Sequence, residues 1–102
     1  MYAVNGKLTA LPGEGEKLLA ILLDAAKGME NMDGCLCYIV GTDENKPEDV
    51  WVYEVWVNEA AHQDSLQLPV FQALIGKARP LIAGMENLPS LVIHGGKAGK
   101  LH

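Results

Sequence analysis

The chain has 102 residues, a formal net charge of −5, 49% hydrophobic and 21% charged residues, which predicts one small globular domain and argues against disorder or a collagen-like chain. The acidic balance, with scattered basic residues, argues against nucleic acid or an anionic membrane as partner, because both require a basic surface. No apolar run approaches the ~20 residues that span a bilayer and no signal-peptide pattern opens the chain, so we expect a cytoplasmic protein without a membrane partner.

The first half of the chain predicts three strands and a helix. Alternating residues indicate a strand over 2–10, and apolar residues at helical spacing indicate a helix over 13–31. A nearly continuous apolar run predicts a strand over 35–41, and a polar loop separates it from a strand over 50–57 that is rich in β-branched and aromatic residues.

The second half predicts two helical pieces and a last strand. Asn58 is a good N-cap for a helix from Glu59 to about Gln67, which should break near Leu68-Pro69. A further helix over 70–82, a strand over 90–94 and a loose tail over 96–102 complete a single domain over 1–95. The order β-α-β-β-α-β predicts an α+β, ferredoxin-like fold with a four-stranded antiparallel sheet and helices on one face.

The predicted third strand is apolar on both sides. Trp51, Tyr53 and Val55 lie on one side, while Val50 and Val52 lie on the other. Helices can cover only one face, and monomers rarely expose a large apolar patch. A second copy is the simplest cover, and we therefore expect a homodimer.

Cys35 and Cys37 are the only cysteines. Their spacing puts both on one face of a strand, where a mutual disulfide would be strained, and zinc sites usually have four ligands. The favoured interpretation is two small buried apolar residues, with a redox or metal role as the alternative. We expect no metal site.

Strong catalytic signatures such as a P-loop, a dinucleotide fingerprint or a nucleophile elbow are absent. Asn5 on a strand could orient a ligand oxygen or bond a neighbouring loop, and Trp56 could stack on a flat ligand or pack in the core. A carboxylate at Glu54 must be paired or have a perturbed pKa. His62 could act as a base and shares a helix face with Ser65, although surface exposure is the more common state of such a histidine.

Phe71, Ile75 and Arg79 follow at four-residue spacing in the predicted 70–82 helix. Phe71 and Ile75 fit the core. Arg79 could close a pocket or face solvent.

At these residues the chain resembles the antibiotic biosynthesis monooxygenase (ABM) domain family, of the small quinol monooxygenase type. The resemblance rests on the run from Tyr53 to His62 with its E-x-W strand end, on Leu68-Pro69-Val70-Phe71, on Gly34-Cys35-Leu36-Cys37-Tyr38, and on the opening strand with its Pro-Gly turn. It covers roughly residues 2–94.

The resemblance implies a dimeric α+β barrel. It also implies, for many members, oxygenation of phenols or quinols by dioxygen without metal, flavin or haem, so no cofactor is expected. Under this reading Asn5 and Trp56 orient the ring and His62 is the nearest titrating group. Many relatives have a histidine where Ser65 stands. Haem-degrading relatives have a Trp and a His where Ser65 and Ile75 stand here, so haem degradation is not expected.

The leading interpretation is a cofactor-independent monooxygenase acting on a small aromatic quinol or phenol. Its expected catalytic residues are Asn5, Trp56 and His62, and its expected substrate-binding residues are Tyr38, Glu54, Ser65, Phe71 and Arg79. The alternatives are a non-catalytic dimeric binding or stress-related module, and an isomerase-like enzyme acting on a small metabolite. One fold hosts many functions, so the fold does not choose between them.

Overall fold

The structure, a computed structural model, describes residues 1–97. Its elements are β1 (Tyr2–Ala10), α1 (Gly15–Gly28), β2 (Cys35–Asp43), β3 (Lys46–Trp56), α2 (Glu59–Ser65), α3 (Pro69–Ala78), the 3-10 helix η1 (Arg79–Leu81), β4 (Ile82–Asn87) and β5 (Leu91–Val92). The predicted α+β, ferredoxin-like fold is confirmed. The tail expected over 96–102 lies, from residue 98 on, outside the described residues.

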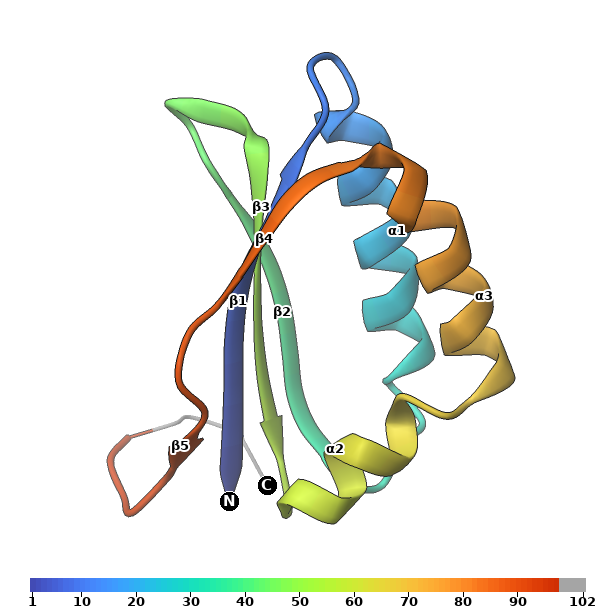
Figure 1. Cartoon of the computed structure of the whole chain (residues 1–102). Helices are drawn as coiled ribbons and strands as arrows, with labels where there is room; N and C mark the ends of the chain where they lie inside the picture. Colours follow the sequence, from blue (N-terminus) through green and yellow to red (C-terminus); the bar gives the residue numbers. More distant parts are fainter. Residues whose placement is uncertain (98–102) are drawn as a thin grey trace.

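All strand pairs are antiparallel, in the order β2-β3-β1-β4. The short β5 pairs with Tyr2 and Ala3 of β1, whereas β4 pairs with the stretch from Gly6 to Ala10. Helices α1 and α3 lie on one face of the sheet, and α2 lies at the end where β3 finishes (Figure 1). We call the covered side the helix face and the other side the open face.

The end of the chain differs from the sequence prediction. The helix expected over 70–82 ends at Ala78, and after η1 the chain enters β4, a strand that the sequence did not predict. Of the strand expected over 90–94, only Leu91–Val92 pairs. β4 is an edge strand whose run Ile-Ala-Gly-Met-Glu-Asn has a single β-branched residue, so the pairing with β1 supplies the order that local propensity does not.

Helix α1 packs on the sheet through the predicted apolar stripe. Leu18, Ala25 and Met29 are buried, and Leu18 packs in a cluster with Val50 of β3. The helix begins at Gly15, two residues later than expected, because Gly13 adopts a φ of 82° in the left-handed region that favours glycine. Burial of this stripe against β3 fixes the helix over one half of the sheet.

The strand register assigns every sheet residue to a face. Val4, Glu54 and Tyr38 are paired neighbours on the helix face, and so are Gly6, Val52 and Val40. Asn5, Tyr53 and Ile39 are paired neighbours on the open face. The two-sided character predicted for the third strand is therefore confirmed.

The open face combines apolar and charged side chains. Ile39 is 57% exposed and Tyr53 is 38% exposed. Farther along, Lys7 Nζ lies 3.4 Å from Glu86 Oε2, 3.9 Å from Asp49 Oδ2 and 5.6 Å from the centroid of the Trp51 ring. A homodimer through this face remains a prediction, and its interface would include this charged cluster.

Candidate functional site

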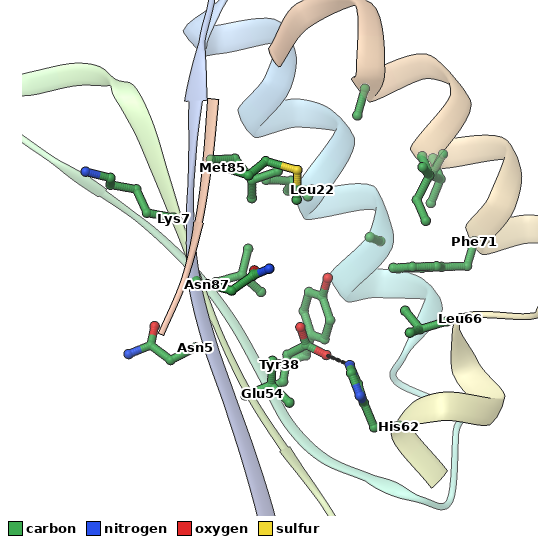
Figure 2. A pocket seen from close by; sticks show the side chains of 18 of the residues that line it. Asn5, Lys7, Leu22, Tyr38, Glu54, His62, Leu66, Phe71, Met85 and Asn87 are labelled. Atoms are coloured by element: carbon green, nitrogen blue, oxygen red, sulfur yellow. Dashed lines mark ion pairs between the residues drawn. The ribbon is translucent and has the colours of Figure 1, made fainter. Parts of the chain in front are cut away.

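A cavity of about 600 Å³ lies between the helix face of the sheet and the helices. This volume is within the range of small-molecule sites. Most of its wall is apolar, and the polar side chains Tyr38, Glu54, His62 and Asn87 project toward its interior (Figure 2). Its volume and its mostly apolar wall with a few inward polar groups make it our candidate for a ligand site.

Glu54 is the buried carboxylate of this cavity. Strand alternation directs it to the helix face, where its side chain is 15% exposed. Burial raises the pKa of Glu54, and the hydrogen bond that Trp56 Nε1 donates to its Oε1 at 3.0 Å opposes this effect. The indole also fixes the direction of the carboxyl, which leaves its oxygens beside His62 and the cavity.

His62 reaches the same end of the cavity from α2. Its Nε2 lies 3.8 Å from Glu54 Oε1, and its ring packs near Tyr2 and Trp56, with centroid distances of 6.0 and 5.6 Å. Burial lowers the pKa of His62, and the charge of Glu59 partly opposes this shift. The ring therefore favours its neutral form, in which one nitrogen can accept a proton.

The position of α2 depends on two local features. Asn58 caps the helix as predicted, since its Oδ1 accepts a hydrogen bond from the Ala61 backbone N–H at 2.8 Å. Gly34 lets the helix approach the start of β2, because a Cβ at Gly34 would lie 2.8 Å from the Ala61 Cβ. Both contacts involve Ala61, the residue directly before His62, and so set where the His62 ring can lie.

Tyr38, Phe71 and Arg79 all line the cavity. Burial raises the pKa of Tyr38, with Glu54 and then Cys35 adding to the effect, so its hydroxyl stays protonated and can donate. Phe71 of α3 forms part of the apolar wall near His62 (Figure 2). Arg79 is exposed in η1, at the end of α3 remote from α2.

Three expected site residues are placed differently. Asn5 borders the cavity, but its side chain points away from Glu54 and His62 (Figure 2), because its neighbours Val4 and Gly6 take the helix face. Trp56 is fully buried in the core rather than forming a stacking wall.

Ser65, the third, is also buried. Its Oγ donates to the His62 carbonyl at 2.6 Å, so it stabilises α2 rather than facing a ligand.

The structure adds Asn87 to the site. Asn87 lies on β4 opposite Gly6, and its side chain enters the cavity from the sheet (Figure 2). A Cβ at Gly6 would lie 3.3 Å from the Glu86 carbonyl oxygen and 3.4 Å from Asn87 Oδ1, so β4 packs closely beside the glycine. The sequence did not point to Asn87, because β4 was not predicted. That Asn87 lies opposite Gly6 becomes visible only once β1 and β4 are paired.

The cysteines are half-buried rather than buried as expected, and neither lines the cavity. Both are free thiols, and burial raises the pKa of each, which favours the protonated form. Among residues 1–97, no group of three or more His, Cys, Asp or Glu side chains is arranged to hold a metal ion. Within the same residues, no helix is both long and apolar enough to cross a membrane.

Comparison with known proteins relates the chain to one family. The profile of antibiotic biosynthesis monooxygenases matches residues 1–77. A solved structure of a candidate antibiotic biosynthesis monooxygenase from Chloroflexus aurantiacus is 40% identical, covers 95% of this chain and 96% of its own, and superposes with a TM-score of 0.83. A second, from Deinococcus radiodurans, is 24% identical over 96% and 97% of the two chains, with a TM-score of 0.84, and supports the fold alone.

A curated protein of Synechocystis sp., named only as uncharacterised, is 28% identical over 80 residues. These residues make up 78% of this chain and 54% of that protein, so the chain spans about half of this relative's length.

Proposed function

Because the chain belongs to the antibiotic biosynthesis monooxygenase family, we propose that it oxygenates a phenol or quinol that binds in the cavity between the sheet and the helices. The dimensions and the mostly apolar wall of the cavity suit an aromatic ligand. Family membership supports monooxygenase chemistry, and the site suggests which residues carry it.

One observation carries the proposal. A buried carboxyl, Glu54, and a neutral imidazole, His62, face each other at 3.8 Å at one end of an apolar cavity. Perturbed titrating groups in a cleft are typical of sites of proton transfer. In this arrangement His62 Nε2 or the Glu54 carboxylate accepts the proton of the substrate hydroxyl, which leaves an electron-rich phenolate in a poorly solvated site.

The proposed reaction balances without a further reductant. A hydroquinone and dioxygen give a hydroxyquinone and one water. One oxygen atom forms a new C–O bond on the ring and replaces a ring hydrogen. The other oxygen atom leaves as water with the remaining protons, and the four electrons that dioxygen takes come from the ring.

The remaining polar residues would orient the ring. Tyr38, held in its protonated form, can donate to a ligand oxygen, and the Asn87 amide can both donate and accept. Trp56 acts as a positioning residue because its indole holds the Glu54 carboxyl. Phe71 supplies an apolar wall against which an aromatic ring can pack.

The proposal is tested by oxygen uptake. The purified protein, treated with a chelator, is mixed with a panel of hydroquinones and phenols, and uptake is compared with the same mixtures lacking protein. We expect uptake above that background and, with isotopically labelled dioxygen, one labelled oxygen atom in the organic product. Uptake that yields hydrogen peroxide and an unlabelled quinone would contradict the proposal.

Absence of uptake across the panel would favour one of the two alternatives. Ligand binding without any chemical change would indicate a binding module. Rearrangement of a ligand without oxygen consumption would indicate an isomerase-like enzyme, since the Glu54–His62 pair could also move protons within a substrate.

A further inference from the structure

The polar side chains Tyr38, Glu54, His62 and Asn87 gather at one end of the cavity, and the lining of the opposite half is apolar apart from the exposed Arg79. Building on the proposed function, we infer that the ligand is a phenol or quinol with an extended apolar substituent. Its hydroxyl-bearing head lies at Glu54 and His62, and its substituent runs along the sheet toward Leu8 and Met85. The ligand class is therefore narrower than small aromatics in general.

The register of the sheet separates the two halves. On the helix face, Val4 is paired with Glu54, and two residues farther along Gly6 is paired with Val52 and Asn87. Two residues beyond that, Leu8 is paired with Val50 and Met85. The polar side chains that the strands direct into the cavity thus end at the Gly6 position, and Leu8 and Met85, which line the cavity beyond it, are apolar.

The cavity is longer than one ring. Val4, paired with Glu54, and Leu8 are four residues apart on β1, which is about 13 Å at the rise of a β-strand. Over this stretch the cavity wall is completed by apolar side chains of the helices and of the β4 start: Ile21, Leu22, Leu74, Ile75, Ala78 and Ile82. A hydroquinone held at Glu54 would leave this half of the cavity without contacts.

Exposure indicates where the substituent would leave the protein. Met85 lines the cavity and is 65% exposed, whereas Ala78, which also lines it, is buried. Figure 2 shows Met85 above Asn87, on the side away from His62. The cavity therefore opens beside β4 at its apolar end, so that a head bound at Glu54 would direct its tail to this opening.

The inference is tested by binding under anaerobic conditions, so that no turnover is needed. The probes are para-methylphenol, para-butylphenol and para-hexylphenol, with affinity measured by calorimetry. We expect the dissociation constant to fall by about fourfold for each methylene that enters the apolar half. Equal affinities for the methyl and hexyl compounds would overturn the inference.

The direction of binding needs a second probe. The methyl ether of para-hexylphenol has the same tail but no hydroxyl proton to donate. We expect it to bind at least tenfold more weakly than para-hexylphenol, because the head then cannot donate to Glu54 or His62. Equal binding of the ether would show that the hydroxyl does not lie at this pair.

A surface variant locates the tail. Met85→Gln changes an exposed side chain at the opening, and Leu23→Gln changes an exposed leucine of α1 that does not line the cavity. We expect Met85→Gln to reduce the gain in affinity from methyl to hexyl, and Leu23→Gln to leave this gain as in the wild-type protein. An equal effect of the two variants would contradict the placement of the tail.

These results are independent of turnover. Chain-length-dependent binding without oxygen uptake by any hydroquinone would leave this inference standing and remove the proposed function. Oxygen uptake with short hydroquinones, together with binding that does not depend on chain length, would support the proposed function and overturn this inference.

Discussion

At the residue scale, the account depends on two side chains whose pKa values move in opposite directions. Burial raises the pKa of Glu54 and lowers that of His62, so the values approach each other. The sequence placed Glu54 and Trp56 on one face of a strand, but the hydrogen bond between them depends on side-chain conformations that spacing does not define. Whether His62 faced solvent was also open, because that depends on how α2 packs.

Turnover should depend on the protonation of His62. If the neutral ring accepts the substrate proton, kcat/KM falls as the pH is lowered through the pKa of His62. Because burial lowers this pKa, the midpoint should lie below 6.5, the ordinary value for histidine. The profile is measured by oxygen uptake, with the protein-free rate subtracted at each pH. A midpoint above 6.5 would argue against His62 as the base.

Glu54 should make folding stability depend on pH. Its pKa in the folded protein is raised above the ordinary 4.5. At a pH between 4.5 and the folded-state pKa, the folded protein therefore holds a proton on Glu54 that the unfolded chain releases. The free energy of unfolding therefore falls as the pH rises through this interval. Glu54→Gln, which keeps an oxygen for the Trp56 N–H, should lose this fall. Urea unfolding at a series of pH values from about 4 to 7 measures this pH dependence. If the free energy of unfolding changed with pH in the same way in the wild-type protein and in Glu54→Gln, burial would not raise the pKa of Glu54.

At the element scale, α2 is the element that completes the site. The sequence predicted its cap at Asn58 and its break before Pro69, because both signals are local. β4 was missed because an edge strand with few β-branched residues owes its order to β1 rather than to its own propensity. Asn87 was therefore not identified either. Asn5 was expected in the site, whereas strand alternation puts its side chain on the open face.

The close approach of Gly34 and Ala61 should show in a double-mutant cycle. Gly34→Ala places a methyl group 2.8 Å from the Ala61 Cβ and should cost about 1–3 kcal/mol of stability. It should also lower turnover, because α2 carries His62. In an Ala61→Gly background the stability cost of Gly34→Ala should largely disappear. Chemical denaturation of the four proteins measures this coupling, and purely additive effects would show that the contact does not position α2.

At the scale of the whole molecule, the open face carries exposed apolar side chains among the described residues 1–97. The sequence predicted apolar side chains there, and Ile39 and Tyr53 are exposed on it. The cluster of Lys7, Asp49 and Glu86 was not predicted, because its members come from three strands whose register is set only in the folded sheet. A homodimer through this face is our proposal, supported by the exposed apolar side chains.

Ile39→Lys tests the dimer. It adds a charge at an exposed apolar position of the open face, so it should shift the protein toward monomer at a fixed concentration. Leu23→Lys, at an exposed leucine on the helix side, is the matched control. Sedimentation velocity measures both. A monomeric wild-type protein, or equal behaviour of the two variants, would refute dimerisation through the open face.

The central claim is that the Glu54–His62 pair carries the chemistry, and the most direct measurement compares oxygen uptake by two variants of α2. His62→Gln removes the titrating ring at 3.8 Å from Glu54, and Asp64→Asn removes a titrating group from an exposed position on the same helix. With folding of both checked by circular dichroism, we predict that His62→Gln lowers kcat/KM by about a hundredfold or more, while Asp64→Asn leaves it unchanged. Wild-type turnover by His62→Gln would contradict the account.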